Sequence, residues 1–215
     1  MKKNLLIAPF DSPLASALAS EASAELWSLA LALPRGASSA PTAGPSAGVA
    51  TFVYDPRSYV AASSLILSAR NALGELDAAV LVLDPASAKT DFLSSKPGEL
   101  SGLVEERCSG PLFLARELAR RFEARKAGSL VLLAPESPRD AALGPVASMA
   151  DGAFGGLGTG LFAAAAGAPW SVYGVRDASG QSERAARYVF ELLAEAKPSK
   201  AGRWLRFSGR SGIFG

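Results

Sequence analysis

Histidine is absent from the sequence, and cysteine occurs once, at Cys108. Without histidine the chain cannot build a Ser–His–Asp hydrolase, a Cys–His protease or most kinds of protein zinc site. A single cysteine allows no internal disulfide and none of the cysteine spacings that hold zinc or iron–sulfur clusters. Any catalytic chemistry must therefore come from Ser, Tyr, Lys, Arg, Asp or Glu side chains.

Excess charge and long apolar runs are also missing. The 22 basic and 20 acidic residues leave a net charge of +2, which is untypical of nucleic-acid-binding proteins and of disordered polyelectrolytes. The apolar runs near the N-terminus and at Leu161–Ala168 are too short for a secretory signal or a membrane span. Because no targeting signal is visible, we expect a cytoplasmic protein that binds neither nucleic acid nor membranes.

Apolar segments of strand length recur along the chain, whose 215 residues suit one domain, 1–215. The segments are continuous rather than alternating, which is typical of strands covered on both faces. They are Leu5–Ala8, Leu26–Leu33, Ala50–Tyr54, Ala78–Leu83, Ser129–Ala134, Trp170–Val175 and Arg203–Phe207.

Helix patterns separate these segments. Asp55 and Pro56 predict a helix start, with Asp as the N-cap, and Gly74 predicts its end. Amphipathic patterns predict two more helices over Gly110–Ala127 and Ser182–Ala196. Strands that alternate with helices predict an α/β fold of three layers, with a doubly wound parallel sheet of about seven strands in the Rossmann arrangement.

Several segments carry a resemblance to a known family. They are Asp55-Pro56 with Gly74–Val82, then Gly110–Arg116, Gly128–Val131 and Gly202–Gly209. In order and spacing they resemble the third and fourth strands, the next helix, the fifth strand and the last strand of the short-chain dehydrogenase/reductase family. The resemblance implies the NAD(P)-binding Rossmann fold of an oxidoreductase.

The cofactor motif of that family is not present. Its first turn, Thr-Gly-x-x-x-Gly-x-Gly, aligns with Ala8–Ala15, where the glycine positions hold Pro9, Pro13 and Ala15. Each proline removes a backbone N–H donor, and Asp11 adds a negative charge where a diphosphate would lie. We therefore expect no NAD(P) cofactor.

The catalytic motif is also missing. The family's Tyr-x-x-x-Lys pair aligns with Ala147 and Asp151, its assisting Ser with the region of Ala134, and its Asn with Arg107. In the family the Lys lowers the pKa of the Tyr that transfers the proton. We therefore expect a protein that is not an active dehydrogenase and acts as a structural, regulatory or partner subunit.

Two alternatives use the same crevice. One is an NAD(P)-dependent oxidoreductase with an atypical site, for which the candidates are Ser137, Glu136, Asp151 and Arg176. The other is a small-ligand binding protein that uses the vacated crevice without catalysis.

The densest glycine stretch, Gly155–Gly160, has two interpretations. One is a phosphate-binding loop. The other is a helix on which Gly152, Gly156, Gly160 and Ala164 form a ridge that permits very close helix packing.

In the resembled family this helix and the preceding one form the interface between subunits. The resemblance therefore implies a homodimer or homotetramer, or a heteromer with an active relative, and packing on the chain's own sheet is the alternative. The candidate interface residues are Leu114, Leu118, Phe154, Leu157, Leu161 and Phe162.

Two further features have two interpretations each. The tail from Lys197 interleaves basic and aromatic residues, which suits an anion-binding tail, but the alternation of Arg203 and Trp204 favours an edge strand. Cys108 lies at an expected helix start, where a thiol pKa can fall, whereas a lone cysteine more often serves as a small buried side chain.

Overall fold

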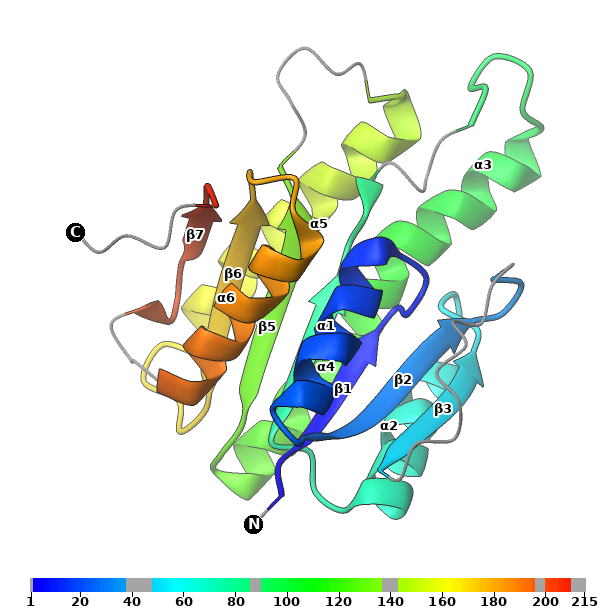
Figure 1. Ribbon diagram of the computed structural model, residues 1–215. Helices are drawn as coiled ribbons and strands as arrows, with labels where there is room; N and C mark the ends of the chain where they lie inside the picture. The colour runs from blue at the N-terminus through cyan, green and yellow to red at the C-terminus, as the bar shows by residue number, and fades with distance from the viewer. Residues whose placement is uncertain (1, 38–47, 86–89, 137–142, 196–199, 210–215) are drawn as a thin grey trace.

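The computed structural model describes residues 2–37, 48–85, 90–136, 143–195 and 200–209. Within these ranges a parallel sheet of seven strands has the order β3-β2-β1-β4-β5-β6-β7 (Figure 1). The predicted strands and the Rossmann arrangement are therefore confirmed. The strands are β1 (Asn4–Ala8), β2 (Ser28–Pro34), β3 (Val49–Tyr54), β4 (Ala78–Val82), β5 (Ser129–Pro135), β6 (Ser171–Asp177) and β7 (Trp204–Phe207).

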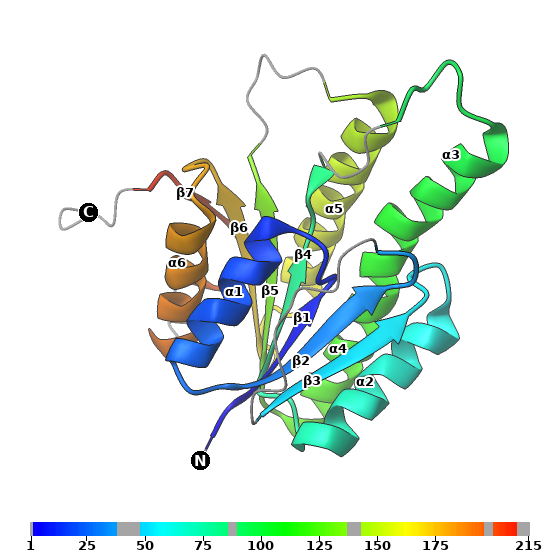
Figure 2. The ribbon, with the colours of Figure 1, turned by 45° about the vertical axis from the view of Figure 1, so that its right-hand side comes forward.

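Helices cover both faces of the sheet, as Figure 2 shows. Two helices, α1 (Pro13–Ala24) and α6 (Ser182–Glu195), pack together on one face. The other face carries α2 (Tyr59–Leu73), α4 (Gly110–Arg125) and α5 (Pro145–Ala164). These are the three layers that the alternation of strands and helices predicts.

The central strand β1 explains the continuous apolar pattern. Leu5 and Ile7 point into the core beneath α1 and α6, whereas Leu6 and Ala8 point into the core beneath α2 and α4. All four side chains are fully buried. A strand that contributes to both cores has no polar face.

The start of α2 differs from the prediction. The N-cap is Ser58, whose side chain accepts a hydrogen bond from the Ala61 N–H at 3.2 Å. Asp55 instead accepts from the Arg57 N–H at 3.0 Å and closes a turn before the helix. The predicted end is confirmed, because Gly74 caps the helix with a φ of 92°.

The helix predicted from Gly110 begins earlier. A further helix, α3 (Pro97–Val104), runs through a π-helical turn at Glu105–Ser109 directly into α4. No residue of α3 is fully buried, so its apolar pattern is weak. The helix ends at Arg125, before the predicted residue Ala127, because Lys126 adopts a left-handed φ of 57°.

Strand β7 forms an edge of the sheet beside β6, which confirms the edge-strand interpretation of this part of the tail. Its Trp204 ring packs over two glycines, Gly158 of α5 and Gly174 of β6. Residues 196–199 and 210–215 of the tail lie outside the described ranges. Among the described residues, no helix combines the length and the apolar character that a membrane span requires.

Candidate functional site

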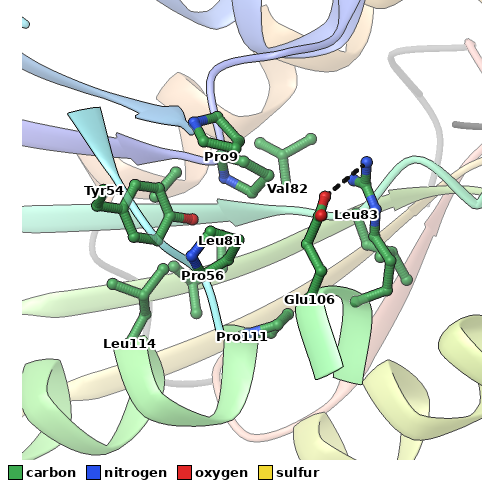
Figure 3. A pocket seen from close by; sticks show the side chains of 12 residues that line it. Pro9, Tyr54, Pro56, Leu81, Val82, Leu83, Glu106, Pro111 and Leu114 are labelled. Carbon is green, nitrogen blue, oxygen red and sulfur yellow. Dashed lines mark ion pairs between the residues drawn. The ribbon is translucent and has the colours of Figure 1, made fainter. Parts of the chain in front are cut away.

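The candidate site lies at the carboxyl ends of β1 and β4. The chain leaves β1 towards α1 on one face of the sheet and leaves β4 towards α3 and α4 on the other. Open α/β sheets bind their ligands at such a reversal of strand order. Figure 3 shows the side chains that line a cavity at this place.

The first βα turn offers few donors to a phosphate. The Ser12 side chain caps α1 by accepting a hydrogen bond from the Ala15 N–H at 3.2 Å. Pro13, the first residue of the helix, has no N–H. Phe10 does not enter the crevice, because it is buried in the core on the α1 side of the sheet. Two donors that a helix N-terminus uses to bind phosphate are therefore not available.

A cluster of charged side chains borders this turn. Arg107 of the π-helical turn donates a hydrogen bond to the carboxylate of Asp11 at 3.5 Å and pairs with Glu106 at 3.1 Å. The exposed fractions of the Arg107 and Asp11 side chains are 11% and 16%. Two carboxylates around one guanidinium leave a negative charge, which opposes a diphosphate.

A small cavity lies between this cluster and Tyr54. Its volume is about 20 Å³, which has room for about one water. Its apolar walls include Pro9, Pro34 and Leu83. These side chains fill part of the crevice.

Tyr54 is the buried polar residue of this cavity, with an exposed fraction of 5%. Burial raises the pKa of its hydroxyl far above the usual value, and the negative charge of Asp11 raises this pKa further. Tyr54 therefore stays protonated at neutral pH and can only donate its O–H or accept through a neutral oxygen.

The start of α5 lies where the resemblance places the catalytic pair. Ala147 is 1% exposed, and it packs with Val146 against Leu100, Leu103 and Val104 at the C-terminal end of α3 and the start of the π-helical turn. The residue at this position is therefore covered by apolar side chains. The methyl side chain of Ala147 has no group that could transfer a proton.

One turn further along α5, Asp151 forms an ion pair with Arg176 of β6. The guanidinium of Arg176 lies 4.7 Å from the centre of the Trp204 ring. The structure thus brings together two candidates for an atypical oxidoreductase site. They are partners of each other, which leaves neither charge free for a substrate.

The other two candidates of that site do not join this pair. Glu136 forms an ion pair with Arg206 of β7 at 2.6 Å, and Ser137 lies outside the described residues. No group of three or more His, Cys, Asp or Glu side chains suited to a metal ion occurs in the described ranges.

The candidate interface residues divide into two groups. Leu114, Leu118 and Phe154 are at most 2% exposed and fill the core between their helices and the sheet. Leu157, Leu161 and Phe162 are partly buried and pack against the same core. Their role between subunits stays a prediction, and the first group has little surface to offer a partner.

Two other sequence features have structural interpretations. The stretch Gly155–Gly160 lies within α5, as the helix interpretation predicts, and does not form a phosphate loop. Cys108 is half-buried in the π-helical turn, where burial raises the pKa of its thiol. The lowered pKa expected at a helix start is therefore not found.

Sequence analysis missed Tyr54 and Glu106 as members of the site. Tyr54 reads as the last residue of a strand, and Glu106 precedes the helix that the pattern predicts. The proline at position 56, directly after the strand, marks the turn that directs this part of the chain over the cavity, and it was the one available signal.

Neither a protein-family model nor a curated protein matches the sequence. Solved structures do match. A short-chain dehydrogenase from Leptospira borgpetersenii, with bound NAD+, has a TM-score of 0.80 at 14% identity, covering 97% of this chain and 92% of that one. The fold is that of the short-chain dehydrogenases and reductases.

Two more structures with this fold match almost the whole chain. A double mutant of a short-chain dehydrogenase/reductase from Serratia marcescens has a TM-score of 0.72 at 18% identity, covering 98% of each chain. A short-chain dehydrogenase from Streptomyces avermitilis has a TM-score of 0.74 at 18% identity, covering 96% of this chain and 88% of that one. Identities this low establish the short-chain dehydrogenase fold and leave the function to be argued from the site.

Proposed function

We propose that this protein uses the short-chain dehydrogenase fold as a scaffold for assembly and does not bind or use NAD(P). The observation that carries the proposal is the ion pair between Asp11 and Arg107. This ion pair holds the carboxylate of Asp11 next to the N-terminus of α1, where a dinucleotide diphosphate would have to lie. An anion is favoured at a helix N-terminus only if the backbone donors there are free.

The covered start of α5 supports the loss of catalysis independently. A Tyr–Lys pair needs an exposed hydroxyl and a positive charge one turn away. The corresponding positions hold the buried Ala147 and the ion-paired Asp151. Both differences remove the proton transfer on which hydride transfer depends.

Cofactor titration tests the first part of the proposal. The purified protein is titrated with NADH and NADPH up to about 1 mM, and nicotinamide fluorescence and heat of binding are recorded. The dehydrogenase from Leptospira borgpetersenii, whose structure contains NAD+, serves as the positive control. We expect no saturable signal. Micromolar binding of either nucleotide would contradict the proposal.

A helix face supports the assembly role. Asp151, which is paired with Arg176, is the one charged residue in α5. A Cβ built on Gly152, Gly156 or Gly160 meets no atom within 4 Å, so this ridge borders open space. An uncharged ridge of small residues allows the same helix of a second copy to approach closely.

A pair of matched substitutions tests the assembly. Gly156→Arg places a long charged side chain on the ridge, and Gly98→Arg does the same on α3, where a Cβ also meets open space. Light scattering coupled to gel filtration should give a dimer or tetramer for the wild type and Gly98→Arg, and a monomer for Gly156→Arg. A wild type that is monomeric at about 100 µM would rule out self-association through this ridge.

A further inference from the structure

An open groove lies at the amino ends of the strands, at the edge of the sheet opposite the candidate functional site. It borders the N-terminal residues and the C-terminal ends of α1 and α6, which lie side by side (Figure 2). Its volume is about 560 Å³, which is the size of a small-molecule site. Its walls include Lys2, Lys3, Glu25, Leu26, Trp27 and Phe190.

Leu26 occupies a position in this groove at which the backbone favours glycine. The Trp27 N–H donates a hydrogen bond to the Ala22 carbonyl at 2.9 Å, and the Leu26 N–H donates one to the Ser23 carbonyl at 3.2 Å. These two bonds end α1 in the arrangement in which a left-handed glycine usually follows a helix. Leu26 has a φ of 59°, which is a strained conformation for a residue with a side chain.

The side chain of Leu26 does not recover this cost within the fold. It is 75% exposed, so the chain buries little of its apolar surface. Backbone strain in proteins is concentrated at functional sites. A ligand that covers Leu26 would remove from water an apolar surface that the folded chain leaves exposed.

An aromatic wall lies beside Leu26. The side chain of Trp27 is partly buried against the core on the α1 side of the sheet. Its ring meets the ring of Phe190 edge to face, with 5.7 Å between the two centres. An indole held in this way, next to an exposed leucine, suits a flat aromatic ring.

The charges at the groove define the other part of the ligand. The ammonium of Lys3 lies 5.2 Å from the centre of the Trp27 ring. The ammonium of Lys2 lies beside Gly48, where a Cβ would be only 2.8 Å away. In the part of the chain that the structure describes, neither lysine forms an ion pair. Two ammonium groups and the carboxylate of Glu25 leave one positive charge, which favours a ligand with one negative charge.

We propose that this groove binds a small aromatic monocarboxylate, whose carboxylate pairs with Lys3 and whose ring packs against Leu26 and Trp27. This binding goes beyond the scaffold function. It requires neither a cofactor nor assembly, because the groove lies at the opposite edge of the sheet from the crevice and away from α5.

Three compounds test the proposal on the full chain. They are 2-naphthoate, the neutral 2-naphthylmethanol, and acetate, which has the charge without the ring. NMR follows the indole N–H signals of the tryptophans during each titration. We expect a saturable shift of the Trp27 signal with 2-naphthoate, about fivefold weaker binding of the alcohol and no saturation with acetate, because an exposed ion pair contributes about a factor of five.

The other two tryptophans are internal controls. The indole N–H of Trp170 donates to Glu123 at 2.8 Å, and the Trp204 ring packs over Gly158 and Gly174. Neither residue borders the groove, so we expect their signals to stay in place during the titrations.

Two lysine variants test the ion pair. Lys3→Gln should weaken the binding of 2-naphthoate about fivefold. Lys96→Gln, which removes an exposed lysine directly before α3, should leave the binding unchanged.

Leu26→Gly separates the two effects of Leu26. It should raise the Tm by about 2–4 °C, because glycine adopts this φ without strain. It should also weaken the binding of 2-naphthoate about fivefold, because apolar contact is lost. A residue with only a structural role would not change stability and binding in opposite directions.

Several results would overturn the inference. They are the absence of a saturable Trp27 shift, equal binding of the alcohol, equal effects of the two lysine variants, and unchanged binding in Leu26→Gly. A Trp27 signal that changes when the protein alone is diluted would assign the groove to a second copy and would also overturn it. Binding of NADH that leaves the Trp27 signal in place would contradict the proposed function alone.

Discussion

Asp11 accepts a hydrogen bond from Arg107 at 3.5 Å, although 96 positions separate the two residues in the sequence. The contact joins the turn after β1 to the π-helical turn before α4. It ties together the two segments that diverge at the carboxyl edge of the sheet. Its removal should therefore affect stability as well as the cavity.

We expect Arg107→Ala to lower the free energy of unfolding by about 2 kcal/mol, because it leaves Asp11 and Glu106 without a counter-charge in a mostly buried place. Urea denaturation at pH 7 measures the change. Arg57→Ala removes an ion pair with Asp55 in which the Arg57 side chain is 51% exposed, and it should cost much less than Arg107→Ala because water screens an exposed pair. Equal losses would contradict this view of the Arg107 contact.

Glu117 gives a pH-dependent prediction. The side chain is 2% exposed; burial would raise its pKa, but hydrogen bonds from Tyr59 and Arg120 and the charges of Arg120 and Arg116 outweigh burial and lower it. Because the pKa of Glu117 is lower in the folded protein, its ionised carboxylate stabilises the fold at any pH above the pKa of about 4.3 that it has in the unfolded chain. This stabilisation is lost as the pH falls through the pKa of the folded protein.

We therefore expect Glu117→Gln to lower stability at pH 7 by about 1–2 kcal/mol, because hydrogen bonds to a charged group are lost. The difference in the free energy of unfolding between the variant and the wild type should shrink as the pH falls below about 4.3. Urea denaturation at pH 7, 4.5 and 3.5 measures this difference. A difference that stays constant over this range would show that the carboxylate charge is not responsible.

The ring of Trp204 predicts the effect of a single methyl group. A Cβ at Gly158 would lie 2.4 Å from the ring, so we expect Gly158→Ala to cost about 2 kcal/mol despite the better helix propensity of alanine. Gly98→Ala on α3 meets open space and should be neutral or stabilising. Thermal unfolding compares the two variants. A neutral Gly158→Ala would mean that the indole ring can move aside.

Restoring the catalytic residues should not restore catalysis. Ala147→Tyr with Asp151→Lys places a phenol beneath Leu100 and Leu103 and leaves Arg176 without its carboxylate. We expect a loss of about 3 kcal/mol or more through overpacking and the unpaired charge, with no NAD(P)H oxidation. Denaturation and absorbance at 340 nm check both points. Turnover with a simple ketone would contradict the scaffold function.

Cys108 should react slowly. Burial raises the pKa of its thiol, so less thiolate is present at a given pH than for an exposed cysteine. Alkylation by iodoacetamide at pH 7, 8 and 9 should be slower than that of a free cysteine at each pH. Faster alkylation would indicate an activated thiol and contradict the structural role.

The strands could be predicted from the sequence because burial on both faces makes a parallel strand continuously apolar. The first residue of each helix was harder to predict, because neighbouring residues compete to be the N-cap. Asp55 and Ser58 are both good caps, and Arg57 engages the first of them. Helix α3 was missed because its apolar residues are only partly buried, against the small cluster of Val146 and Ala147. Such a helix shows little periodic apolar pattern in the sequence.

Function-related contacts were less predictable. Apolar spacing identifies the buried side of α4 and α5 but not what covers it, and Leu114, Leu118 and Phe154 meet their own sheet. The small-residue ridge drew attention to Gly152, Gly156 and Gly160, whereas the glycine that packing requires in α5 is Gly158. No local pattern joins Asp11, Tyr54 and Arg107.

The position of β1 has a consequence for how the chain folds. Its neighbours are β2 and β4, and Leu5 pairs with Ala78. The middle of the sheet thus depends on segments that are far apart in sequence, which slows folding. During synthesis one edge of β1 has no partner strand until β4 has emerged from the ribosome. Newly made chains should therefore depend on chaperones until then.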